Sequence, residues 1–94
     1  LGTDNEYLST LEIASKLSRN KLGTDHPTTL IILNNLAERH ISKGELDRSI
    51  PLLEEIIQAK KNQNGKDYPE TIIAITNLAS VYLKKNQNAK SITL

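Results

Sequence analysis

One seven-residue segment occurs twice in the chain, 42 residues apart. Residues 23–29 read Gly-Thr-Asp-His-Pro-Thr-Thr, and residues 65–71 read Gly-Lys-Asp-Tyr-Pro-Glu-Thr. The likeness continues downstream, so that 12 of the 30 positions in 23–52 are identical to their counterparts in 65–94. A fixed period of about 20–50 residues is typical of proteins built from stacked repeats. The period therefore predicts a solenoid and directs the search for function toward surface recognition.

Apolar residues follow helical spacing throughout the chain, and no segment alternates with a period of two. We expect helices over about 4–22, 25–42 and 46–61, a fourth from 67–69, and a fifth from 87–89. In each repeated turn, glycine ends one helix, aspartate caps the next, and proline falls in its first turn. The tetrapeptide Lys-Asn-Gln-Asn at 61–64 and 85–88 is predicted to form turns, with Asn86 replacing Gly44. The predicted fold class is all-α, an α-solenoid of antiparallel helix hairpins without strands.

Composition bears on how this chain is organised. Its 94 residues hold at most one domain, and an apolar share of 37% without Trp or Phe is poor material for a lone globule. We expect 1–94 to be a single segment of a longer array, since roughly three repeats are needed for stability. Within it, 4–22 is interpreted as the second helix of a preceding repeat, 25–62 as a full repeat, and 67–94 as a truncated one.

Four stretches of the first copy carry a family resemblance. They are Leu-Gly-Thr-Asp-His-Pro-Thr-Thr-Leu at 22–30, Leu-Asn-Asn-Leu-Ala at 33–37, Gly-Glu-Leu-Asp at 44–47 and Pro-Leu-Leu at 51–53. The pattern resembles tetratricopeptide repeats, in particular the 42-residue version of kinesin light chains, over nearly the whole chain. The resemblance implies a tetratricopeptide-like superhelix. His40 stands where an aromatic residue is usual, as at Tyr82, so we expect weaker packing there.

In tetratricopeptide-repeat proteins the first helix of each repeat lines a concave groove. The resemblance assigns to that groove Ile31, Asn34, Asn35, Glu38 and Ile41, and one repeat later Ile73, Thr76, Asn77, Ser80 and Lys84. Asn35 and Asn77 are the foremost candidates, because an amide offers one acceptor and two donors to a peptide backbone. The alternative is that they cap or bridge helices inside the solenoid. No basic clamp occurs at these positions, so an acidic peptide is a poor candidate ligand.

Two functions stay open at this point. The first is a protein–protein interaction scaffold that binds a peptide or partner segment in the concave groove, an adaptor like the kinesin light chains. The second is a structural or oligomerising segment of a larger sensor or enzyme, without a ligand of its own. In the second case we expect the chain to self-associate through exposed repeat ends.

Charge and residue types argue against other classes of function. The 12 basic and 11 acidic residues give a net charge of +1, without the basic patch that nucleic acid requires. The chain has no cysteine, and His26 and His40 share no ligand at metal-binding spacing, so no metal or cofactor is expected. No catalytic signature is present, which predicts a non-enzymatic chain. No apolar run reaches 18 residues, so we expect no membrane span and take the cytoplasm as the default location.

Overall fold

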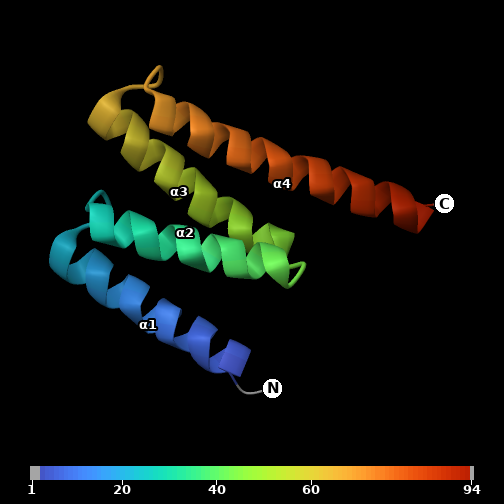
Figure 1. Ribbon diagram of the computed structural model, residues 1–94, viewed down its shortest axis with the longest axis horizontal. Helices are drawn as coiled ribbons and strands as arrows, with labels where there is room; N and C mark the ends of the chain where they lie inside the picture. Colours follow the sequence, from blue (N-terminus) through green and yellow to red (C-terminus); the bar gives the residue numbers. More distant parts are fainter. Residues whose placement is uncertain (1–2, 94) are drawn as a thin grey trace.

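The computed structural model describes the backbone of residues 3–93 and the side chains of residues 4–88. It consists of four helices: α1 (Thr3–Leu22), α2 (Pro27–Ser42), α3 (Leu46–Asn64) and α4 (Pro69–Thr93). Each helix packs against the next along the chain, and successive helices run antiparallel (Figure 1). The described residues contain no strand. The predicted all-α architecture of packed helical hairpins is therefore confirmed.

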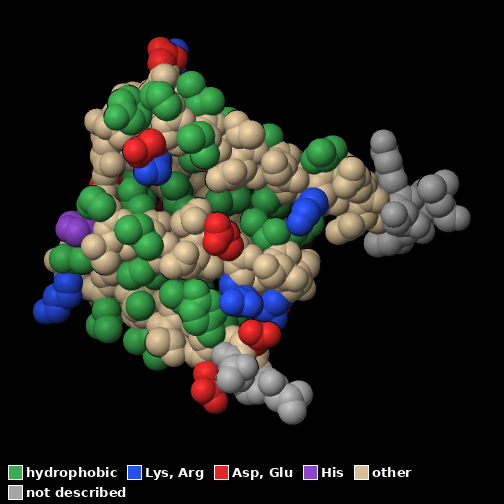
Figure 2. Space-filling model, viewed as in Figure 1, with side chains coloured by type: hydrophobic (Ala, Val, Ile, Leu, Met, Phe, Trp, Pro, Cys, Tyr) green, Lys and Arg blue, Asp and Glu red, His purple; other side chains and the backbone are tan. Residues whose placement is uncertain are grey.

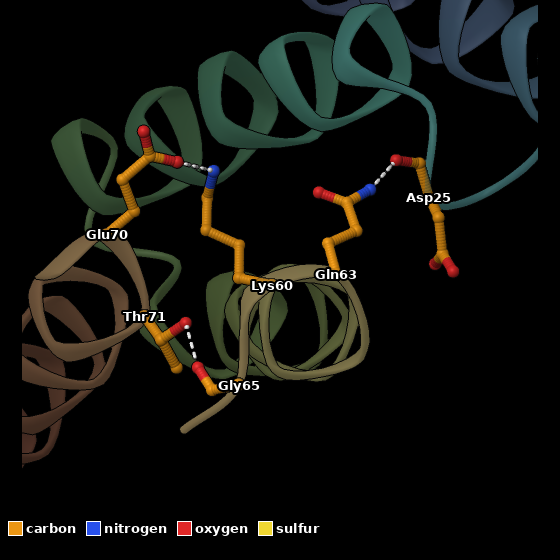
Figure 3. A network of polar contacts seen from close by, with 6 residues as sticks. All are labelled: Asp25, Lys60, Gln63, Gly65, Glu70 and Thr71. Carbon is orange, nitrogen blue, oxygen red and sulfur yellow. Dashed lines mark hydrogen bonds and ion pairs between the residues drawn. The ribbon is translucent and has the colours of Figure 1, made fainter. Parts of the chain in front are cut away.

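The repeated seven-residue segment forms the same closed turn in both places. Gly23 and Gly65 adopt φ values of +95° and +86°, which disfavour any residue with a Cβ atom. The hydroxyl of Thr29 donates to the carbonyl oxygen of Gly23 at 2.8 Å, and that of Thr71 donates to Gly65 at 3.0 Å (Figure 3). Both threonines are fully buried. The first and last residues of the segment recur because they bond to each other.

The residue that caps α2 is His26 rather than Asp25. The Nδ1 atom of His26 accepts the backbone N–H of Thr28 at 3.1 Å, and Pro27 follows as the first helical residue. Asp25 lies one position earlier in the turn, where its carbonyl oxygen accepts the side-chain amide of Gln63 (Figure 3). The predicted role of aspartate as the cap was therefore wrong at this turn.

The core lies where α3 packs against both α2 and α4. It includes Leu33 and Ala37 from α2, Leu53 from α3, and Ala74 and Val81 from α4. These positions follow the helical spacing seen in the sequence. α3 contributes buried side chains to both contacts. It therefore fixes the positions of α2 and α4, which pack against it from two sides.

The two hairpins differ at the end of their first helices. α2 ends at Ser42, and Gly44 follows with a φ of +79°. α4 continues to Thr93 instead, so the predicted turn at 85–88 and the predicted fifth helix were wrong. Asn86 stands where Gly44 stood, and a left-handed conformation that glycine adopts freely is unfavourable for a residue with a Cβ. For the same reason α3 runs through 61–64 and ends only at Gly65.

Candidate functional site

A groove runs along one face of the molecule between α2 and α4, with α3 as its floor. Three hollows follow one another along it, from Pro27 and Glu70 at one end to Ile41 and Lys84 at the other. Each of the three hollows takes residues from α2, α3 and α4. We call this feature the α2–α4 groove. Its geometry depends on α3, which contacts both walls.

Most of the residues assigned to a groove from the sequence line the α2–α4 groove. They are Ile31, Asn34, Asn35, Glu38 and Ile41 on α2, and Ile73, Asn77, Ser80 and Lys84 on α4. Thr76 is the exception, since it lines none of the three hollows. Its hydroxyl donates to the carbonyl oxygen of Ile72, one turn earlier on the same helix, at 2.9 Å.

The floor of the groove comes from α3, which the sequence reasoning did not include. Leu53, Ile56, Lys60 and Gln63 all line its hollows. Their spacing of three, four and three residues places them on one face of a helix. That spacing was present in the sequence, but only the stacking of the hairpins shows that this face lies open toward the groove.

The three asparagines of the groove differ in their surroundings. Asn34 lines all three hollows, and its amide donates to the carboxylate of Glu38 at 3.3 Å. Asn77 is exposed and lines two hollows, while Asn35 is half-buried at the groove's first end. Within the described part of the chain, neither Asn35 nor Asn77 makes a side-chain hydrogen bond. No hydrogen bond there supports a capping or bridging role for these two amides.

Charges of both signs line the groove. At the first end the ammonium of Lys60 pairs with the carboxylate of Glu70 at 3.1 Å (Figure 3). At the other end Glu38 and Lys84 lie on opposite walls, and neither takes part in an ion pair among the described residues. Figure 2 shows this scatter of acidic and basic side chains, singly or in small groups, with apolar side chains between them. Among the described residues, the lining of the groove carries two acidic and two basic side chains.

Comparison with known families supports this architecture. Residues 29–67 match the tetratricopeptide repeat family. The matched segment takes in most of α2, all of α3 and the turn that follows, so it spans the hairpin whose two helices form one wall and the floor of the groove. No curated protein matches the chain significantly. The match supports a tetratricopeptide-repeat protein, and such repeats are typically non-catalytic modules of protein interaction.

A partly buried polar contact closes the hairpin of α2 and α3 at the turn between them. His40 is 6% exposed, and its Nδ1 lies 2.9 Å from the carboxylate of Glu45. Because an ionised carboxylate only accepts hydrogen bonds, this nitrogen carries the proton. The hydrogen bond from His40 lowers the pKa of Glu45, and the charges of Lys43 and Arg48 act in the same direction. The contact lies outside the groove and serves the hairpin itself.

The described residues offer neither of two further classes of site. They contain no group of three or more His, Cys, Asp or Glu side chains placed to hold a metal ion. None of their helices combines the length and apolar character needed to cross a membrane. The α2–α4 groove is accordingly the feature on which we base the proposed function.

Proposed function

We propose that this chain is a protein-interaction scaffold that holds an extended peptide in the α2–α4 groove. The tetratricopeptide match supports an interaction scaffold in general terms. The observation that carries the proposal is the exposed amide of Asn77, which lines two adjoining hollows and makes no hydrogen bond among the described residues. We further propose an adaptor role of the kinesin-light-chain type, which the resemblance of the sequence supports.

The dimensions and lining of the groove suit an extended segment. Residues 27–41 of α2 rise over roughly 20 Å, a length that about six extended residues cover. The amides of Asn34 and Asn77 supply donors and acceptors from opposite walls, and a peptide backbone needs both. Leu53 and Ile56 provide an apolar floor for alternate side chains of such a segment.

A screen of random displayed peptides against the whole 94-residue chain tests the proposal. Asn34→Ala and Asn77→Ala are each expected to weaken the selected peptides about fivefold, the equivalent of about 1 kcal/mol for one hydrogen bond. Asn35→Ala is expected to act in the same direction at the groove's first end. Asn20→Ala is the matched control, because Asn20 is an exposed helical residue of α1 outside the groove. Unchanged affinity in both Asn34→Ala and Asn77→Ala would show that the groove is not the binding site.

One observation favours the second function, an oligomerising segment. Leu33 and Ala37 of α2 are fully buried beneath α3. Their counterparts 42 residues later, Ile75 and Ala79, are exposed on α4, and so is Tyr82, the counterpart of buried His40. Apolar faces of a solenoid that lack a neighbouring helix favour association. We propose this face of α4 as the surface through which the chain would self-associate.

Sedimentation velocity over a range of concentrations separates the two functions. Self-association through α4 predicts an average mass that rises with concentration in the wild type and stays monomeric in Tyr82→Glu. Tyr68→Glu is the control, because Tyr68 is equally exposed but lies in the turn before α4. A folded wild-type monomer at high concentration would rule out the oligomerising function and leave the peptide scaffold.

A further inference from the structure

The far end of the α2–α4 groove is a hollow with an apolar floor and two opposite charges on its walls. Its volume is about 200 Å³. Its apolar base consists of Leu53 from the floor, Ala37 from the α2 wall and Val81 from the α4 wall, and these side chains are 3%, 0% and 2% exposed. An engineered apolar cavity of about 150 Å³ holds a benzene molecule. The hollow is therefore large enough for one branched or aromatic side chain.

The two charges of this hollow have no ion-pair partner among the described residues, although the Glu38 carboxylate accepts one hydrogen bond from the Asn34 amide at 3.3 Å. Glu38 belongs to α2 and Lys84 to α4, so they face the hollow from opposite walls. Both side chains are exposed, and neither forms an ion pair among the described residues. Two nearby lysines do form ion pairs. Lys60 is paired with Glu70, and Lys85, the next residue after Lys84, is paired with Asp47 at 2.7 Å.

We propose that this hollow determines which peptides the groove prefers. One apolar side chain of the peptide enters the hollow, and the residues on its two sides carry opposite charges. The basic neighbour pairs with Glu38, and the acidic neighbour pairs with Lys84. This inference rests on the proposed function, because it assigns a sequence preference to a peptide held in the same groove.

The charges select against wrong peptides more than they add affinity. Exposed ion pairs contribute little net free energy in water, whereas like charges brought together are unfavourable. A peptide with two basic neighbours would bring one of them to Lys84, and a peptide with two acidic neighbours would bring one to Glu38. A preference of about threefold to tenfold is therefore expected, and it should weaken in about 1 M salt, where charges are screened within about 3 Å.

The test uses four seven-residue peptides that differ only beside a central leucine: Lys-Leu-Glu, Glu-Leu-Lys, Lys-Leu-Lys and Glu-Leu-Glu, each between Gly-Ala and Ala-Gly. Their binding to the whole chain is measured by NMR titration. For the wild type, at least one mixed-charge peptide is expected to bind about threefold to tenfold tighter than either single-sign peptide. Replacing the central leucine of that peptide by serine should weaken it about tenfold, as expected for losing a buried aliphatic side chain.

Reversing the charge of Glu38 or of Lys84 gives both walls of the hollow the same sign. The expected peptide then has two like charges, so the prediction does not depend on the direction in which the peptide lies. Glu38→Lys makes both walls basic, so Glu-Leu-Glu should become the preferred peptide. Lys84→Glu makes both walls acidic, so Lys-Leu-Lys should become the preferred one. Glu54→Lys and Lys66→Glu are the matched controls, since they change the net charge equally at exposed residues that lie outside the hollow and form no ion pair among the described residues. Both controls should keep the mixed-charge preference of the wild type.

The outcomes distinguish this inference from the proposed function. Equal binding of the four peptides, or the same shift in controls and reversals, would overturn the inference. If none of the four binds while peptides from the random screen do, the inference fails and the scaffold stands. If no peptide of either set binds, both fail. A wild-type dimer that Glu38→Lys dissociates would assign the hollow to a second copy of the chain and also overturn the inference. Far-ultraviolet circular dichroism confirms that each variant remains helical.

Discussion

At the scale of single residues, a few local hydrogen bonds explain why particular residues recur in the sequence. The hydroxyls of Thr29 and Thr71 bond to the carbonyl oxygens of Gly23 and Gly65, which begin their turns. The Thr29 hydroxyl gives its one proton to Gly23, so its contact with the Ser18 hydroxyl has Ser18 as the donor. The Ser18–Thr29 contact thus joins the first turn to α1, whereas the counterpart of Ser18 in α3 is Lys60, which pairs with Glu70 instead.

Valine in place of threonine tests this role of the turn hydroxyls. Thr71→Val keeps the shape of the side chain and removes one buried hydrogen bond, so it should lower the free energy of unfolding by about 1 kcal/mol. Thr29→Val should cost more, because it also leaves the Ser18 hydroxyl without its acceptor. Urea unfolding measures both, with Thr76→Val as a control whose hydroxyl bonds on the exposed face of α4. Equal costs for Thr71→Val and the control would contradict the account.

The contact between His40 and Glu45 predicts a dependence of stability on pH. The pKa of Glu45 lies below its ordinary value of 4.5 in the folded chain, chiefly because His40 donates a hydrogen bond to the carboxylate. The contribution of this group is therefore complete at pH values above 4.5 and is lost as the pH falls through the lowered pKa.

Glu45→Gln is the variant that measures this contribution. It should lower the free energy of unfolding at pH 7, and the difference from the wild type should shrink as the pH falls below the pKa of Glu45. The control is Glu54→Gln, at an exposed glutamate of α3 with no ion pair in the described part of the chain. Urea unfolding at several pH values gives the comparison. A difference between Glu45→Gln and wild type that stays constant with pH would contradict the assignment.

At the scale of the elements, α2 and α4 carry the same apolar sequence pattern, but the pattern is buried in α2 and exposed in α4. Leu33 of α2 is fully buried because α3 covers it, whereas its counterpart Ile75 of α4 is 41% exposed. The helical pattern predicted that both residues share the apolar stripe of their helix. It contained no information on whether another helix lies over that stripe, since this depends on the neighbouring element rather than on the helix itself.

The difference between the two stripes leads to a prediction about alanine substitutions. Leu33→Ala removes a buried side chain and should lower the free energy of unfolding by about 2–5 kcal/mol. Ile75→Ala should cost distinctly less, because its side chain already meets solvent in the free chain. Urea unfolding at low protein concentration measures both. Equal costs would mean that the α4 face is covered in solution. That result would contradict the structure, in which Ile75 is exposed.

At the scale of the whole molecule, the sequence periodicity predicted the fold class correctly, whereas the positions of helix ends were predicted least well. The 42-residue period and the helical spacing were sufficient to predict an all-α stack of hairpins. The end of α4 was predicted wrongly, because Asn86 was treated as equivalent to Gly44 although the left-handed conformation costs less free energy for glycine than for asparagine. The residues assigned to a groove on α2 and α4 do lie along one, with the exception of Thr76. The floor from α3 was missed, because it follows from how the hairpins stack.

We propose that the α2–α4 groove holds a peptide through the amides of its asparagines. The most direct measurement is a ¹H–¹⁵N NMR titration of the side-chain amides with the strongest peptide from the displayed library. If the groove is the binding site, the amide signals of Asn34 and Asn77 should shift until saturation, and the signal of Asn20 on α1 should not move. Shifts confined to α1 or to residues outside the groove, with Asn34 and Asn77 unmoved, would contradict it.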